Sequence, residues 1–281
     1  MTSDQQKFAA RVKELIAEAQ DLTEETAAGV LRMLEQTQHE LLGRLASESG
    51  RLTGYSTWQL HSLLDEVERQ MRYFRDHATR AIQGAQAKAY ATGAQIAEEP
   101  MKQIGLHVLL PALNRQALIV AQGYSAALVK GLTREATVKI NGALRRSMMG
   151  GQQFSEIVAQ VSKALGGDGG VFDEIGNRAL RITRTEVLRM SSIATDARMK
   201  DFAKRIPDLE EEWHHTVQRA GRRGHILMNG QAVPVGENFY NDFTGEELRY
   251  PRDPEAPASE TVNCACFVIP RVPGIAALRA A

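Results

Sequence analysis

Apolar residues recur at helical spacing along the first two thirds of the chain. The clearest case begins at Ser56, where STWQLHSLLDEVERQMRYF carries an apolar stripe down one side of a helix. The stripe consists of Leu60, Leu63, Leu64, Val67, Met71 and Phe74. The pattern continues without proline to about Glu99, where Glu-Glu-Pro predicts the end of the helix. Such a helix would be about 60 Å long, which is typical of a bundle or an extended arm.

Other helices precede and follow this one. An amphipathic pattern over 5–48 predicts a helix of similar length, and the stretch from Pro111 predicts one that is apolar almost all round. Thr133 is expected to cap the next helix. Helical pattern then persists to about residue 208. We expect the apolar stripes to pack mainly against neighbouring helices rather than to form a groove for a partner.

The chain changes character near residue 210, where Pro, Gly, Asn, Asp and aromatic residues become frequent. The pair Asn229-Gly230 predicts a tight turn, because both residues tolerate positive φ, and it would join HILM to QAVPV in a β-hairpin. A proline-rich loop follows, and VNCACFVIP is typical of a buried terminal strand. This part of the chain therefore predicts loops and short strands.

These patterns together predict a mainly α protein with two parts. Residues 1–130 are expected to form a long-helix bundle or arm. Residues 131–270 are expected to form a second part with helices to about 208 and a small α+β module over 211–270, which contains the β-hairpin and the terminal strand. Residues 271–281 would be a tail.

Composition narrows the function classes. The chain has 281 residues, a formal net charge of +0 and two cysteines. Because the net charge is zero, no overall electrostatic field attracts nucleic acid or membrane, and any charged partner would have to bind a local charged patch. Two cysteines do not form a disulfide framework, and the polar N-terminus lacks an apolar signal segment. We expect a protein that folds in a reducing compartment and is not embedded in a membrane.

The two cysteines, Cys264 and Cys266, are one residue apart. On a strand their side chains would share one face, about 7 Å apart, which is too far for an easy mutual disulfide. They could hold zinc together with one or two histidines, of which His214, His215 and His225 are nearest in sequence, and Asp253 is also available. His225 is the histidine that we predict as a ligand, although the spacing is not that of a common zinc finger. They could also be small buried hydrophobic residues or redox-active thiols. The sequence favours core packing over zinc, and zinc over redox chemistry.

Several other side chains are candidates for structural or binding roles. Trp213 is expected to anchor the core of the small module. Asn263 is expected to make turn-like bonds before the last strand. A basic loop could contact DNA phosphates, or it could be an exposed loop, because glycines flank its arginines. Its candidate residues are Arg219, Arg222 and Arg223.

Five motifs in order resemble the phage head morphogenesis family, the Mu F-like minor head proteins. They are Arg184-Thr185-Glu186, Trp213, His225 with the turn at Gly230, PRDPEAP from Pro251, and Asn263-Cys264-Ala265-Cys266. The resemblance covers roughly residues 130–270. One departure concerns an acidic residue and an arginine that the family usually carries between the tryptophan and the histidine. Here those positions are Gln218 and Ala220.

The resemblance implies a minor structural protein of a tailed-phage head rather than an enzyme. Such a minor capsid protein would take part in viral assembly by binding the portal protein at its vertex, the scaffold or the major capsid protein. It would assemble in the host cytoplasm, lie in the virion inside the head near the portal, and could be ejected with DNA. Arg184 or Glu186 would fix the C-terminal module to its helix. The alternatives are a toxin-like or transferase-like enzyme built on that module, and a non-specific DNA-binding internal head protein.

Overall fold

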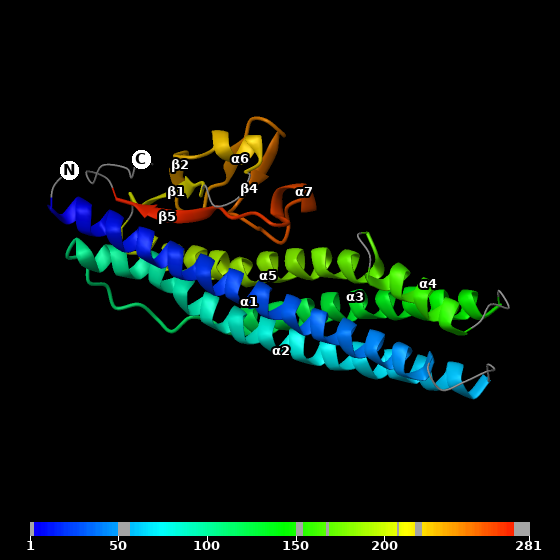
Figure 1. The fold of residues 1–281 in the computed structure, drawn as a ribbon. Coiled ribbons are helices and arrows are strands. Elements are labelled where there is room, and N and C mark those ends of the chain that lie inside the picture. The colour runs from blue at the N-terminus through cyan, green and yellow to red at the C-terminus, as the bar shows by residue number, and fades with distance from the viewer. Residues whose placement is uncertain are drawn as a thin grey trace. The chain divides into compact units, whose positions relative to one another are not determined.

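A computed structural model describes residues 3–49, 57–149, 154–166, 169–206, 208–216 and 221–272. Long helices make up most of the described first two thirds, as the apolar stripes predicted, and a non-helical segment over 104–115 joins two of them (Figure 1). The helices are α1 Ser3–Ser49, α2 Thr57–Gln103, α3 Gln116–Met149, α4 Phe154–Gly166 and α5 Val171–Ala203. The prediction of a mainly α protein with long N-terminal helices is therefore confirmed. None of the described helices is both long and apolar enough to cross a membrane.

Three predicted helix boundaries were wrong. The helix predicted from Pro111 begins only at Gln116. The helix predicted to end at Glu99 continues through Pro100 to Gln103. Because Pro100 lies in the last turn, its missing N–H removes one hydrogen bond close to the helix end. Thr133 does not cap a helix, since α3 is continuous across it. Its hydroxyl donates to the carbonyl oxygen of Val129, so the preceding turn satisfies it.

The chain after α5 forms the predicted small α+β module. Its elements are β1 Glu210–His214, α6 Arg223–Leu227, β2 Ala232–Pro234, β3 Phe239–Asn241, β4 Glu246–Leu248, α7 Ala258–Thr261 and β5 Phe267–Arg271. One antiparallel sheet has the strand order β2-β1-β5, and β3 pairs with β4 in a separate hairpin. The module therefore contains a β-hairpin and a terminal strand, as predicted, although the hairpin is not the expected one.

The turn at Asn229-Gly230 does not join two paired strands. The segment before it, including His225, forms α6, and β2 after it pairs with β1 instead. Only Gly230 has a positive φ, of 83°, so the two-residue turn that needs positive φ twice is not formed. The terminal strand also starts later than expected: β5 begins at Phe267, and both cysteines lie in the segment that leads into it.

The chain divides into two compact units. Unit 1 consists of the described parts of Met1–Glu25, Gln83–Gln122 and Arg184–Ala281, and unit 2 of those of Thr26–Ile82 and Gly123–Thr183. The ranges predicted for the arm and the second part, 1–130 and 131–270, remain a prediction. The break between them falls inside the continuous helix α3.

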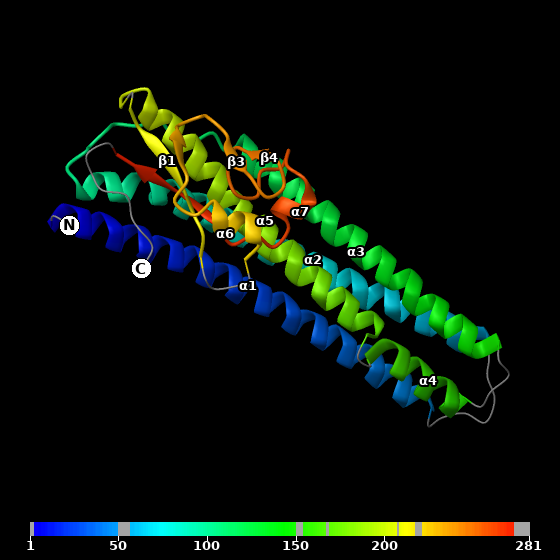
Figure 2. The same cartoon turned by 90° about the horizontal axis from the view of Figure 1, so that it is seen from above.

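Unit 1 contains two apolar cores. In the first, Phe267 and Ile269 of β5 pack with Phe8 of α1 and Leu188 of α5, which places β5 along both helices in both views (Figures 1 and 2). The second core lies within the module around Trp213, which is completely buried. The described elements of unit 2 are helices, and its buried residues include Phe74, Ile140 and Leu165.

Candidate metal centre

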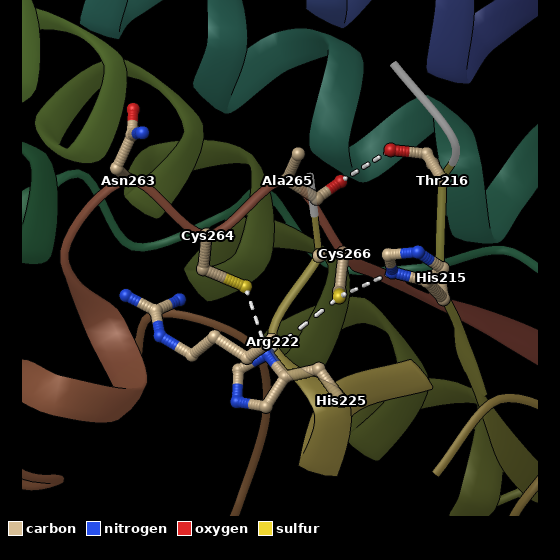
Figure 3. Close-up of a pocket in the computed structure, with 9 residues that line it drawn as sticks. His215, Thr216, Arg222, His225, Asn263, Cys264, Ala265 and Cys266 are labelled. Atoms are coloured by element: carbon tan, nitrogen blue, oxygen red, sulfur yellow. Dashed lines mark hydrogen bonds between the residues drawn. The ribbon is translucent and has the colours of Figure 1, made fainter. Parts of the chain in front are cut away.

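Three buried side chains of the module converge on one point in unit 1. They are His225 of α6 and the two thiols, Cys264 and Cys266, and their donor atoms all lie within 4.8 Å of one another. The Nδ1 atom of His225 is 3.4 Å from Sγ of Cys264 and 3.7 Å from Sγ of Cys266. The two sulfurs and the imidazole face one another across a small cavity (Figure 3). These three residues are the predicted metal ligands.

The backbone turn at Asn263 brings the two thiols to this point. Asn263 has a φ of 61°, a left-handed conformation that asparagine tolerates better than most residues. Its N–H donates to Oγ1 of Thr185 on α5 at 2.9 Å. Arg252, also buried, donates to the carbonyl oxygen of Cys264 at 2.8 Å. The segment that carries the cysteines is therefore held from both sides, and in Figure 3 the Asn263 side chain points away from the sulfurs.

A buried carboxylate sets the orientation of His225. The Nε2 atom of His225 is 2.7 Å from Oε2 of Glu260, which also accepts a hydrogen bond from Asn241 at 3.1 Å. A carboxylate accepts, so Nε2 carries the proton and Nδ1 presents its lone pair to the sulfurs when the ring is neutral. Trp213 packs edge-on against the ring, with the ring centroids 5.1 Å apart.

A second histidine lies beside the thiols. The Nδ1 atom of His215, which follows β1, is 3.6 Å from Sγ of Cys266. The backbone N–H of His215 donates a hydrogen bond to the side-chain oxygen of Asn229 at 2.8 Å. Gly221 lies against its ring, and a Cβ there would be 2.3 Å from Cε1 of His215. His215 was one of the three nearby histidines in the sequence, but only His225 was predicted as a ligand.

Burial and close contacts change the acidity of these groups. A hydrogen bond with Cys266 lowers the pKa of Cys264 well below its usual range, and His225 lowers it further. The same thiol contact raises the pKa of Cys266. For His225, desolvation lowers the pKa, but its bonds to Cys264 and Glu260 outweigh it and leave the pKa raised. The two thiols therefore lose their first proton readily and their second with difficulty.

The residues predicted to dock the module occupy different places in unit 1. Arg184 pairs with Glu24 of α1, at 2.7 Å, rather than with the module. Glu186 pairs with Arg189 at 2.6 Å, and Arg189 donates to the carbonyl oxygen of Arg252. Within this motif Thr185 makes a direct hydrogen bond to the module, at Asn263. Glu186 is connected to the module through Arg189.

The three arginines of the basic loop are not equivalent. Arg219 lies outside the described residues. Arg222 donates to the carbonyl oxygen of Val262 and lines the small cavity, so its guanidinium has a structural contact. Arg223 is exposed, and its guanidinium lies 5.4 Å from the ring centroid of Phe243. Contact of this loop with DNA stays a prediction.

Comparison with known proteins gives one family match. Residues 138–269 match the family described as phage Mu protein F like protein. The matched range contains α4, α5 and the module up to β5, and therefore every candidate residue of the metal centre. No solved structure matches the chain.

Two curated proteins are similar at low identity. The chain is 24% identical over 276 residues to a protein named NAD(+)–arginine ADP-ribosyltransferase EFV from Enterococcus faecalis, a match that covers 94% of this chain and 55% of that protein. It is 25% identical over 180 residues to uncharacterised protein YqbB from Bacillus subtilis, which covers 63% of this chain and 56% of that protein. The chain thus spans a little over half the length of both relatives.

Proposed function

We propose that this chain is a minor structural protein of a tailed-phage head. The premise is that residues 138–269 belong to the phage Mu protein F like family. In this proposal the chain takes part in head assembly by binding the portal protein, the scaffold or the major capsid protein, and the portal vertex is its main partner. The family match carries the proposal, because it spans the whole C-terminal module with its ordered motifs. The long helices support it, since they offer extended surfaces for docking.

Exposed apolar side chains of unit 1 support a location for the proposed portal contact. Three large apolar side chains are well exposed within a short stretch of sequence: Leu109 is 95% exposed, Ile119 59% and Val120 62%. Exposed apolar side chains that gather together often mark protein interaction sites. All three lie within residues 1–130, the range that the sequence assigned to the arm. We therefore assign portal binding to this stretch.

Co-purification of the full chain with the portal protein of the same phage tests this assignment. The double variant Ile119→Glu and Val120→Glu should abolish portal capture, because each change places a charge in the apolar contact. The matched control is Val138→Glu, which alters an equally exposed residue of α3 beyond residue 130. Equal portal capture by both variants and the unchanged protein would contradict the assignment.

The position in the particle follows from the same proposal. A portal-bound minor protein would be assembled in the host cytoplasm and packaged inside the head near the portal. Quantitative mass spectrometry of purified virions, before and after DNA release, tests this position. We expect a few copies per particle, with loss on release if the protein leaves with DNA. A chain absent from virions but present in procapsids would instead indicate a role limited to assembly.

A transferase is the second candidate, and it rests on the name of the relative from Enterococcus faecalis. Nearly half of that relative lies outside the match, so its activity need not lie in the shared part. Incubation of the purified chain with labelled NAD(+) and an arginine-rich acceptor would test this candidate. Transfer of label that survives removal of contaminating enzymes would overturn the structural proposal in favour of an enzyme.

A further inference from the structure

Beside the three donor atoms that lie within 4.8 Å of one another, a fourth donor lies next to one of the two thiols. Besides Nδ1 of His225, Nδ1 of His215 faces Sγ of Cys266 at 3.6 Å. The two nitrogens approach the sulfurs from different segments, one after β1 and one on α6 (Figure 3). Cys266 therefore lies near two imidazoles, and all four side chains carry donors of a type that zinc prefers.

The distances match the geometry of one shared ion. For tetrahedral zinc with its usual bond lengths to nitrogen and sulfur, a nitrogen and a sulfur ligand lie about 3.6 Å apart. Three of the four nitrogen–sulfur distances are 3.4 and 3.7 Å from His225 to the two sulfurs and 3.6 Å from His215 to Cys266. The cavity between these side chains has a volume of about 20 Å³, which is enough for one water-sized group or ion. Weak thiol–imidazole hydrogen bonds would not require so many donors to meet at one cavity.

Glu260 supplies the outer contact that a metal-binding histidine usually makes. Histidine ligands commonly donate their second ring N–H to a carboxylate, which fixes the ring and makes the other nitrogen a better donor. His225 has this arrangement, with Nε2 2.7 Å from a carboxylate that is only 3% exposed. Asn241 holds the same oxygen from the other side. Glu260 therefore acts through His225 and is a positioning residue.

We propose that Cys264, Cys266, His225 and His215 bind one zinc ion in a closed, structural site, with Glu260 as the positioning residue. Binding releases the thiol protons and leaves two thiolates and two neutral imidazoles around the ion. Four protein ligands leave no open position for substrate, so the ion joins segments rather than performing catalysis. It would link the chain after β1 to α6 and to the segment before β5. This inference does not depend on portal binding.

Metal analysis of the full chain, purified under reducing conditions with zinc in the growth medium, tests the proposal. We expect one zinc per chain, and a competing chromophoric chelator should release it while both thiols become reactive. Substitution with Co²⁺ should give the visible absorption of a tetrahedral ion with thiolate ligands. A chain that stays without zinc after reconstitution, and whose thiols react freely from the start, would overturn the proposal.

Two adjacent histidines provide a matched pair of variants for the fourth ligand. Loss of an outer-shell contact weakens metal binding by about tenfold or more. His215→Ala removes a direct ligand, so we expect it to weaken zinc binding further than that. His214→Ala, the neighbouring change, should leave the affinity as it is. Equal affinities for the two variants would remove His215 from the site. The helical circular dichroism signal of each variant shows that it has folded, so a loss of zinc is not confused with a loss of structure.

Glu260→Gln separates positioning from ligation. Glutamine can still accept the N–H of His225 but lacks the charge, so we expect zinc affinity to fall by about tenfold while one zinc per chain still binds at saturation. The Co²⁺ spectrum should keep its tetrahedral form, because the four ligands are unchanged. An unchanged affinity would contradict the positioning role of Glu260, and a changed spectrum would make Glu260 a ligand itself.

Discussion

Unit 2 and unit 1 bury different kinds of side chain. Among the described residues, the buried side chains of unit 2 are apolar or uncharged, as Phe74 and Ile140 illustrate, and its ion pairs include exposed ones such as that between Lys139 and Glu174. Unit 1 buries a whole set of charged residues as well as two apolar cores. Those buried charged residues are Glu186, Arg189, Arg198, Glu211, Glu212, Arg252, Asp253 and Glu260.

This difference shows what specifies each unit. Helix packing in unit 2 needs apolar residues at a helical period, and many sequences with that pattern would satisfy it. The module of unit 1 has short strands and many loops, and specific polar contacts fix their positions. Arg252 is one example, since it joins the carbonyl oxygen of Cys264 to the hydroxyl of Ser192 on α5. Four predictions, in order of decreasing effect, test this contrast.

Phe74→Ala should have the largest effect, because it removes a fully buried ring from the core of unit 2. We expect a loss of roughly 3–5 kcal/mol in the free energy of unfolding, which urea titration followed by circular dichroism would measure. Tyr73→Ala is the control, since its side chain is 45% exposed. A smaller loss for Phe74→Ala than for the control would mean that unit 2 does not depend on its apolar core.

Arg252→Met should cost about 3 kcal/mol, because it leaves the Cys264 carbonyl and the Ser192 hydroxyl without their charged donor. The same titration measures the loss. Methionine keeps much of the volume, so an effect of this size would come from hydrogen bonding rather than from a cavity. If the variant were as stable as the unchanged protein, the buried network would not specify the module.

Glu211→Gln should change the pH dependence of stability. Burial raises the pKa of Glu211 to about 8. Because the unfolded chain releases this proton near pH 4.5, the folded state binds more protons between the two values. Stability from this group therefore falls as pH rises from about 5 to 8, by at most about 1.4 kcal/mol per pH unit.

Thermal unfolding at a series of pH values would measure this slope. The advantage of the Glu211→Gln variant over the unchanged protein should grow from pH 5 to pH 8. Glu210→Gln, on the same strand but more exposed, should give no such growing advantage. A constant difference across the range would show that Glu211 ionises normally in the folded protein.

Glu174→Gln should have the smallest effect. It removes an ion pair with Lys139 in unit 2, in which both side chains are 51% exposed. Exposed pairs contribute little, so we expect less than about 0.5 kcal/mol, decreasing further in high salt. Urea titration at low and high salt checks this value. A large, salt-insensitive loss would mean that surface charge supports unit 2 more than its apolar core does.

The helices could be predicted from sequence because their signal is local. The apolar stripe from Leu60 to Phe74 repeats within a few residues, and the helix it predicts is present. The segment around His225 could not be assigned in this way, and it formed a helix where a strand was expected. Its side chain contacts Cys264, 39 residues later, and Glu260, 35 residues later. A single sequence does not reveal pairings at such separations.

The candidate site was predictable in part. Residue type and motif order selected His225, Cys264 and Cys266, which the structure brings together. Glu260 carried no signal, because an acidic residue in a loop is usually exposed. His215 did carry one: it lies two positions after Trp213, and both should share a face of the strand. Alternation along that strand favours His215 over His214, its neighbour among the nearby histidines.

The central position of β1 in its sheet has a consequence for the order of folding during synthesis. Its partners β2 and β5 are made after it, and β5 ends at Arg271. Unit 2 ends at Thr183, so the ribosome has made all of it before β1 is translated. Phe8 of α1 packs in a core that also contains Phe267 and Ile269, so this core is incomplete until β5 has been synthesised. Translation therefore completes the helical unit 2 first, whereas the start of α1 can complete its core only after β5, the last strand, has been synthesised.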